Sequence, residues 1–540
     1  MSSKLFRGTL ILSLGTYISK FLGLFYVIPF YALIGGEDNA ALFSYGYTPY
    51  TIFLSIATAG VPLAVSKFIS KYNTLGEYEV GRKLFKSGLL VMVLTGIASF
   101  IVMYAFAPYF ADITIAYNDE QKVKVEDVTT VIRAVSFALL IIPFMSLIRG
   151  FFQGHQSMGP SAVSQVVEQI VRIVFLLAGV FFVLKVMNGS LTTAIALATF
   201  AAFVGGVASL AVLMWYWIKR KPKLDALPSK SPGTLTISYR DMYKEILVYS
   251  VPFVFVGLAN PLFQVIDQFT VNKAMGAIGL AADADRFFGI LNFSSHKLVI
   301  IPVSLATAFS MTLIPLVTES FVKGSRTELK HQIDQTFQVL MYLTIPAAIG
   351  ISILAEPAYT IFYDHSIDGT MVLRAYAPVA ILFALFAVTA AILQGINEQK
   401  YTILSLLIGL LVKLVLNIPL IEKFQIYGAI IATTLGYLIA IIINLFVIKH
   451  YAKYNFKMVS RRVMLMGIFN IVMAIVVWIV YTLLQLLLNP ANTLSAVVIV
   501  TICGTIGASL YFYLGFRSYL IDKLFGDRAI KLRRKLGLGS

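Results

Sequence analysis

Ionisable residues inside long apolar stretches are the first candidates for a functional site. Four basic residues lie deep in such stretches: Lys20, Arg172, Lys297 and Lys413. At about 1.5 Å of helix per residue, each lies roughly 15–18 Å from the end of its stretch, near the centre of a hydrocarbon core about 30 Å thick. A charge there costs about 2.5–3.5 kcal/mol, so each one is a site candidate by default. Lysine stems are too short to reach the interface from this depth, and we therefore expect these residues to face a shared interior cavity.

Three further ionisable residues are candidates for a supporting or coupling role. Glu168 lies four residues before Arg172 on one helical face, where the two charges would either neutralise each other or share a site. Asp267 is near the outer end of its stretch, where it is either solvated or binds a cation or proton. His296 directly precedes Lys297 and is either a satisfied polar residue or part of the site.

The balance of these charges predicts the ligand. The deep positions hold four cations against Glu168, with Asp267 peripheral. A cavity left net positive in a low dielectric is unstable when empty unless water fills it. Lys and Arg are the standard partners of phosphate and pyrophosphate. The sequence therefore predicts an anionic ligand, whereas a pump for cationic drugs would need the opposite balance.

Several other classes of protein are excluded. The single Cys503 allows no intramolecular disulfide and no multi-cysteine metal site. The chain lacks the GxxxxGK[ST], GxGxxG, HExxH and GxSxG patterns of nucleotide-binding and hydrolytic proteins. We therefore expect no enzyme, no metal and no cofactor, and a process driven by the membrane potential or an ion gradient. The net charge of +17 does not indicate nucleic-acid binding, because no basic soluble domain accompanies it.

The elements that carry these residues are membrane helices. Of 540 residues, 59% are hydrophobic and 13% charged, whereas soluble chains carry about 25% charged residues. A membrane-spanning helix needs about 20 mostly apolar residues. The sequence predicts an all-α integral membrane protein with fourteen transmembrane helices, at 9–34, 42–66, 84–106, 128–152, 160–183, 190–217, 245–271, 286–316, 336–355, 371–394, 401–421, 427–449, 461–487 and 493–519.

The distribution of Lys and Arg predicts the orientation. With a cytoplasmic N-terminus, 31 of the 43 basic residues fall in inner segments and six in outer loops. This bias is the positive-inside pattern, so we expect both termini in the cytoplasm. Much of the excess positive charge then faces anionic lipid.

An internal repeat predicts the organisation of the helices. Residues 132–154 align without gaps on 373–395, with Arg133 over Arg374 and the pair Gln153-Gly154 over Gln394-Gly395. Six helices separate the two copies, so both have the same orientation, and such parallel repeats form two lobes with the substrate site between them. The expected organisation is two pseudo-symmetric six-helix lobes at 1–218 and 245–449, a basic cytoplasmic linker at 219–244, extra helices 13 and 14 within 450–519, and a basic tail at 520–540.

Three segments carry a resemblance to a known family. They are SKLFRGTLILSLGTYISKFLG at the N-terminus, SLIRGFFQGHQSMGPSAVSQVVEQIVRI at 146–173 and HKLVIIPVSLATAFSMTLIPLVTES at 296–320. They resemble the MurJ/SpoVB-like branch of the multidrug/oligosaccharidyl-lipid/polysaccharide (MOP) exporter superfamily, and within it the Gram-positive MurJ-type lipid II flippases. The resemblance implies that the chain moves undecaprenyl-pyrophosphate-disaccharide-pentapeptide from the inner to the outer leaflet by alternating access. It further implies a groove for the lipid tail at helices 13 and 14.

The resemblance also implies roles for particular residues. Lys20 and Lys297 fall where Gram-negative members carry arginines and would grip the pyrophosphate. Helix 2, TPYTIFLSIATAG, lacks a further arginine of those members, and Arg172 or Lys413 would supply the missing charge. The expected partners are lipid II, membrane lipids and cell-wall synthesis enzymes, for a monomer in the bacterial plasma membrane.

Three alternatives remain at this point. One is a flippase for another prenyl-linked polysaccharide precursor, which carries a similar phosphate-bearing anchor. The second is a cation-coupled multidrug antiporter of the same superfamily, in which Asp267 or Glu168 would be indispensable. The third is a non-transporting scaffold for cell-wall enzymes, against which the buried charges argue.

Overall fold

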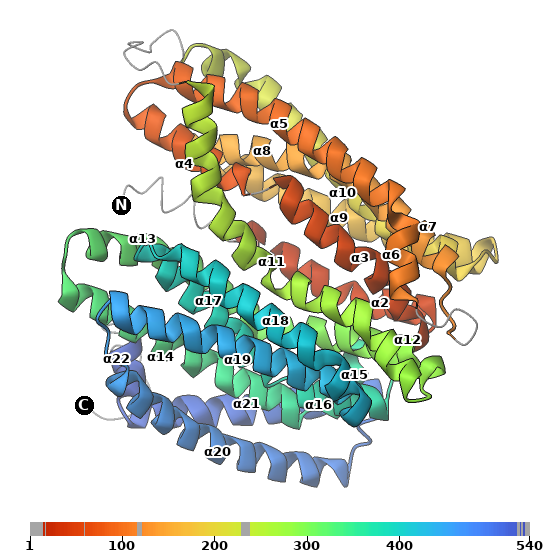
Figure 1. Ribbon diagram of the computed structural model, residues 1–540. Helices are drawn as coiled ribbons and strands as arrows, with labels where there is room; N and C mark the ends of the chain where they lie inside the picture. The colour runs from red at the N-terminus through yellow and green to blue at the C-terminus, as the bar shows by residue number, and fades with distance from the viewer. Residues whose placement is uncertain are drawn as a thin grey trace. The chain divides into compact units, whose positions relative to one another are not determined.

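The computed structural model describes residues 14–16, 18–58, 60–115, 121–227, 238–525, 530 and 533–534. These residues form helices joined by short turns, and none of them is in a β-strand. The expectation of an all-α protein is therefore confirmed for the described part of the chain (Figure 1). Contacts divide the chain into two compact units, which meet between Arg286 and Phe287.

The first unit begins with a span at Leu14–Ile34, whose last part is α2. Its helices are α2 (Val27–Ile34), α3 (Glu37–Thr58), α4 (Val61–Thr74), α5 (Tyr78–Ala105), α6 (Ala107–Thr114), α7 (Val125–Ser136), η1 (Phe137–Leu140), α8 (Ile142–Gly154), α9 (Met158–Phe181), η2 (Phe182–Val186), α10 (Leu191–Asp225) and α11 (Tyr239–Ala277). Helix α12 (Ala281–Gly289) crosses the boundary between the units.

The second unit continues from α12. Its helices are η4 (Ile290–Ser295), α13 (His296–Val322), α14 (Arg326–Ile353), α15 (Ala355–Phe362), α16 (Ile367–Tyr376), α17 (Val379–Gly395), α18 (Gln399–Phe424), α19 (Ile426–Tyr451), α20 (Lys457–Gln485), α21 (Thr493–Arg517) and α22 (Leu520–Phe525). Residues 228–237 of the expected linker, and 526–529, 531–532 and 535–540 of the expected tail, lie outside the described residues.

The described residues contain 13 helices that are long and apolar enough to cross a membrane. The expected count of fourteen is not confirmed, because 42–66 is divided between α3 and α4. Gly60, with φ +67°, has the left-handed backbone that favours glycine. Pro62 then lies in the first turn of α4, where a missing N–H costs no helical hydrogen bond. The Gly60-Val61-Pro62 sequence therefore separates α3 from α4 within the stretch 42–66, which hydropathy had predicted to be one helix.

The repeat seen in the sequence is present in the turns of the structure. Helices α8 and α17 end at Gly154 and Gly395, which are 241 residues apart. The turns after them reverse at Gln156 and Asn397, the two equivalent residues, with φ of 55° and 62°. Each residue donates its N–H to the glutamine carbonyl three positions earlier. Helices α9 and α18 then begin at the same offset.

Helix α11 packs within the first unit, although the repeat assigns it to the second half of the chain. It contacts α3, α4 and α6. Gln268 and Asn272 donate hydrogen bonds to Thr114 and to Tyr45. The contacts place the boundary between the two units after α11. The repeat instead places it at the 219–244 linker, so the lobe boundaries remain a prediction.

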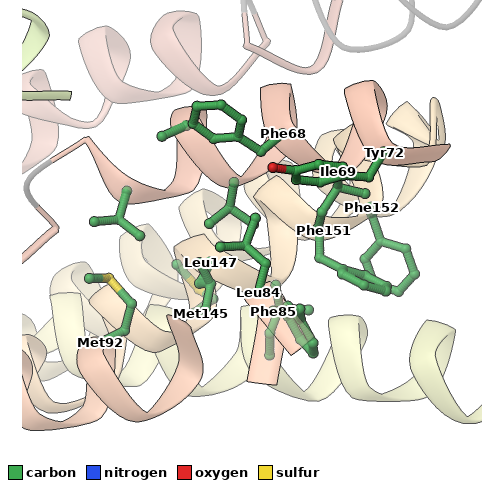
Figure 2. Packing of buried hydrophobic residues seen from close by; sticks show 14 of the residues in the cluster. Phe68, Ile69, Tyr72, Leu84, Phe85, Met92, Met145, Leu147, Phe151 and Phe152 are labelled. Carbon is green, nitrogen blue, oxygen red and sulfur yellow. The ribbon is translucent and has the colours of Figure 1, made fainter. Parts of the chain in front are cut away.

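A cluster of aromatic side chains packs where α4, α5, α8 and α10 meet. Phe85 and Phe151 have ring centroids 4.2 Å apart, and Trp217 stacks on Phe85 at 5.2 Å. Figure 2 shows Phe68 and Tyr72 of α4 beside this cluster. Helix α4 approaches α8 closely at Gly150, where a Cβ would lie 2.3 Å from the Pro62 carbonyl. This core fixes α8 and therefore positions Arg149 on it.

Helices α20 and α21 belong to the second unit through α14. Three glutamines of α14, spaced by three residues, each form a hydrogen bond with a different helix. Gln332 donates to Ser320 of α13, and Gln335 donates to the Leu524 carbonyl of α22. Gln338 accepts a hydrogen bond from Arg462 of α20. The apolar side of α22 is buried on this assembly. Near the other end of α20, Tyr481 donates to Glu356 of α15 at 2.7 Å. Helix α20 is therefore anchored near both of its ends.

Candidate anion-binding site

Lys20 lies on the first span, on a different face from the exposed apolar side chains of that helix. The exposed apolar side chains of this helix form one stripe: Leu14, Ile18, Phe21 and Phe25. At about 100° per residue, Lys20 lies roughly 100–160° around the helix from that stripe. Its side chain is exposed, and the described residues offer it neither a hydrogen bond nor an ion pair. Lys20 is therefore an exposed cation that lies on a different face of the helix from its exposed apolar side chains and has no acidic partner among the described residues.

The first span runs parallel to α9 and packs closely on it. A Cβ on Gly15 would lie 2.9 Å from the Ala162 Cβ, and Thr16 donates to Gln165 at 3.2 Å. Further along, a Cβ on Gly23 would lie 3.1 Å from the Gln169 amide nitrogen. Lys20 lies between Thr16 and Gly23, so it is level with α9 residues 165–169.

Arg172 follows one turn further along α9 and faces the interior of the first unit. The exposed apolar side chains of α9 are Val163, Ile170, Val174 and Phe181, and Arg172 lies about 160–180° around the helix from them. Its Nη2 donates to the Tyr47 hydroxyl of α3 at 2.8 Å, and its guanidinium carbon lies 5.2 Å from the centre of the Tyr47 ring. No carboxylate among the described residues pairs with Arg172.

Glu168 does not neutralise Arg172, because it pairs with Arg149 of α8. The Arg149 Nη2 lies 2.7 Å from Glu168 Oε2, and both side chains are less than one-fifth exposed. Arg149 also donates to Ser164 at 2.9 Å and to Ser209 of α10 at 2.7 Å. One of the two interpretations of the Glu168 and Arg172 spacing, mutual neutralisation, is therefore wrong for this structure. The charge of Arg172 stays in excess.

Gly205 of α10 allows this arrangement. A Cβ there would lie 2.8 Å from the Glu168 carbonyl oxygen and 3.0 Å from the Arg172 Cβ. Contacts that short are excluded by van der Waals repulsion, so any other residue would push α9 away from α10. Gly205 thus allows α10 to pack directly against the part of the α9 backbone that carries Glu168 and Arg172.

Lys413, the repeat equivalent of Arg172, has a different environment. Its side chain is fully buried between α18 and α19 in the second unit, and its Nζ donates to the Thr433 hydroxyl at 2.5 Å. Thr433 in turn donates to the Ala429 carbonyl within α19. The ammonium group therefore joins two packed helices and is not exposed at a surface of the second unit.

Lys297 and His296 begin α13, directly after the π-helical turn η4. The Lys297 Nζ lies 3.7 Å from the centre of the Phe293 ring, a cation–π contact. His296 Nδ1 lies 3.0 Å from the Tyr376 hydroxyl. The His296 ring packs beside the Phe383 ring. Lys297 and His296 are both half-buried. Lys297 belongs to the second unit and Lys20 to the first, so the structure describes each with its own neighbours.

Asp267 is buried on α11, with only 4% of its surface exposed. It directly precedes Gln268, which belongs with Tyr45, Asn272 and Asp285 to a polar network in the first unit. The expectation of a solvated residue is wrong for this structure. A cation- or proton-binding role stays a prediction. Among the described residues, no three His, Cys, Asp or Glu side chains are grouped so that they could hold a metal ion.

The structure thus places Lys20, Arg172 and Glu168 on two neighbouring helices of the first unit, the first span and α9, and places Lys297, His296 and Lys413 in the second unit. Sequence reasoning missed Arg149 and Tyr47. The repeat carried a signal for Arg149: at the equivalent positions of the second copy, Arg149 becomes Ala390 and Glu168 becomes Gly409, so both charges are lost together. Arg172, in contrast, becomes Lys413 and keeps its charge.

Together, the 13 helices that are long and apolar enough to cross a membrane and the repeated turns define a multi-pass, all-helical membrane protein with an internal repeat, within the described part of the chain. Solved structures support this fold. One titled as a lipid II flippase MurJ in an inward closed conformation superposes with a TM-score of 0.64 at 15% identity, over 94% of this chain and 99% of the other. An inward-facing multidrug resistance MATE family transporter of the MOP superfamily gives a TM-score of 0.64 at 15% identity, over 80% of this chain and 94% of the other.

Sequence comparison narrows the class to a family. Residues 5–321 match the model of the polysaccharide biosynthesis protein family. The lipid II flippase MurJ of Bacillus subtilis is 49% identical over 99% of both chains. Stage V sporulation protein B of the same organism is 23% identical, over 81% of this chain and 82% of that one. The chain belongs to the polysaccharide biosynthesis protein family, within its MurJ branch.

Proposed function

We propose that this protein is a lipid II flippase, which moves undecaprenyl-pyrophosphate-disaccharide-pentapeptide from the inner to the outer leaflet by alternating access. The observation that carries the proposal is Lys20: a lysine within a membrane-spanning helix, on a different face from the exposed apolar side chains and without an acidic partner among the described residues. Such a cation in a membrane is stable only beside water or an anion. Identity of 49% over the full length with a lipid II flippase supports the choice of anion.

In this proposal Lys20 and Lys297 bind the pyrophosphate, and the prenyl tail stays in lipid along α20 and α21. The protein acts as a transporter and not as an enzyme, at the bacterial plasma membrane, with both termini in the cytoplasm. Its remaining partners are membrane lipids and enzymes of cell-wall synthesis, and it works as a monomer without a cofactor. The membrane potential or an ion gradient drives the movement, because a charge crossing the membrane gains about 2.3 kcal/mol per 100 mV.

The test is the distribution of lipid II across the membrane of spheroplasts depleted of the native chain and supplied with a variant. We expect Lys20→Gln and Lys297→Gln to abolish the appearance of lipid II in the outer leaflet, at normal protein level. Lys20→Arg should retain transport because it keeps the charge. Lys185→Gln, an exposed lysine of η2, is the matched control and should transport normally.

Two outcomes contradict the proposal. Full lipid II translocation by both glutamine variants would show that neither lysine binds the substrate. An unchanged lipid II distribution upon depletion, with accumulation of another prenyl-linked precursor, would assign the chain to a different glycan. A multidrug antiporter would instead lose transport when Asp267 or Glu168 is neutralised and keep it in Lys297→Gln.

A further inference from the structure

We infer that Arg172 is a second anion-binding residue of the first unit, and that Tyr47 is the positioning residue that holds its guanidinium ready for phosphate oxygens. The inference deepens the proposed function and rests on it for the identity of the ligand. It also selects Arg172 over Lys413 as the additional cation.

The first argument is charge. Arg172 lies within a membrane-spanning helix, half-buried and about 160–180° around the helix from the lipid-facing stripe. The carboxylate that could have neutralised it, Glu168, is occupied by Arg149. An uncompensated guanidinium in this setting is strongly disfavoured unless an anion or water meets it. Lys413 differs, since it is wholly buried and its ammonium group is bound to Thr433.

The second argument is the chemistry of Tyr47. A carboxylate at this position would orient Arg172 but would also cancel its charge. The Tyr47 hydroxyl accepts one hydrogen bond at 2.8 Å, and the ring contributes a cation–π contact at 5.2 Å. A neutral phenol therefore orients the guanidinium and leaves its charge unchanged. A guanidinium has five N–H donors, so those not bound to Tyr47 remain for the paired oxygens of a phosphate.

The third argument is rigidity. The Tyr47 ring is stacked on Phe43, with centroids 5.3 Å apart and planes 15° apart. It also contacts Tyr50, one turn along α3, at 5.2 Å. At the other end of the arginine, Gly205 of α10 lies against the Arg172 Cβ. Both ends of the side chain are fixed, and the loss of side-chain entropy upon anion binding is correspondingly small.

The fourth argument is proximity to Lys20. The first span is parallel to α9, and Lys20 is level with residues 165–169. Arg172 is three to seven residues further along α9, about 5–10 Å along the axis. The two cations together would bind a pyrophosphate more tightly than a single phosphate.

The test measures binding of inorganic pyrophosphate to the purified full chain in detergent, and lipid II flipping in proteoliposomes. We expect Tyr47→Phe to raise the half-saturating substrate concentration about 5- to 10-fold, the effect of one hydrogen bond to a charged group, with little change in the maximal rate. Arg172→Gln should raise it further, and Arg172→Lys should restore part of the loss. Tyr216→Phe removes the hydroxyl from another tyrosine that contacts an arginine, Arg220, and should leave both readouts unchanged.

The double variant separates positioning from a structural role. If Tyr47 acts through Arg172, Tyr47→Phe adds nothing in an Arg172→Gln background. Normal pyrophosphate binding by Arg172→Gln, or fully additive effects of the two substitutions, would overturn the inference. A wild-type protein that binds pyrophosphate through Arg172 but does not flip lipid II would refute the proposed function and leave the inference standing.

Discussion

The ion pair between Arg149 and Glu168 determines how much positive charge the interior of the first unit retains. Arg149 pairs with Glu168 of α9, the helix on which the first span packs, and it also donates hydrogen bonds to Ser164 and Ser209. The pair contributes no net charge. Lys20 and Arg172 then remain as two cations without a counter-ion among the described residues.

Removing one member of this pair should destabilise the protein more than removing both. Glu168→Gln leaves the Arg149 guanidinium without its charged acceptor, and we expect a loss of about 2–4 kcal/mol, because the pair is more than four-fifths buried. The double variant Arg149→Gln/Glu168→Gln leaves no unpaired charge and should recover part of that loss. Thermal unfolding in detergent measures both. A Glu168→Gln variant as stable as wild type would contradict the assignment.

At the scale of elements, the site depends on the distance between α9 and α10. Gly205 permits this distance at the level of Glu168 and Arg172. In the second repeat a glycine also permits close helix packing, at a position that is not equivalent to Gly205. Gly409 of α18 lies against the Gly436 carbonyl of α19. Close approach of the paired helices is therefore common to both units, whereas the Arg149–Glu168 ion pair is particular to the first, because the second copy has Ala390 and Gly409 at these positions.

A side chain at Gly205 should affect both stability and anion binding. Gly205→Ala places a Cβ against the Glu168 backbone, and we expect a cost of about 1–3 kcal/mol from overpacking. The shift of α9 should also raise the half-saturating concentration of pyrophosphate. Gly504→Ala on α21, where a Cβ meets nothing within 4 Å, is the control and should match wild type in both measurements. Equal behaviour of the two variants would show that α9 is not held by this contact.

Sequence patterns predicted the helices well, because a bilayer demands continuous apolar runs of a fixed length. They failed at 42–66, where hydropathy could not distinguish one helix from two that meet at Gly60. The candidate site was predicted in part. Position deep within an apolar stretch identified Lys20 and Arg172 as candidates. Whether a carboxylate neutralises Arg172 depends on Arg149, which pairs with Glu168 and lies 19 residues before it. Tyr47 is 125 residues from Arg172, and no local spacing reveals that contact.

At the scale of the molecule, a buried polar network joins α11 and α12 to the rest of the first unit. Asp285 is 1% exposed and accepts hydrogen bonds from the Tyr45 hydroxyl at 2.7 Å, from Gln121 at 3.0 Å and from the Val123 N–H at 3.1 Å. Asn272 donates to the same Tyr45 hydroxyl at 2.8 Å. The Tyr45 hydroxyl thus binds Asn272 of α11 and Asp285 of α12.

Removing the Tyr45 hydroxyl should loosen α11 and α12 together. Tyr45→Phe leaves two buried polar partners with one hydrogen bond fewer each, and we expect local stability to fall by about 1–3 kcal/mol. Hydrogen–deuterium exchange of residues 268–285 should accelerate while α9 is unaffected. Tyr50→Phe, on the same helix and equally buried, is the control. Unchanged exchange in Tyr45→Phe would show that packing alone holds the two helices.

The position of α11 has a consequence for a chain divided into two polypeptides. A break within the 219–244 linker would leave α11 at the start of the second polypeptide, while the side chains that satisfy its buried polar groups belong to the first. Neither fragment could cover these groups alone, as in a domain-swapped pair. Two such halves, produced from separate genes, would therefore associate without a covalent connection.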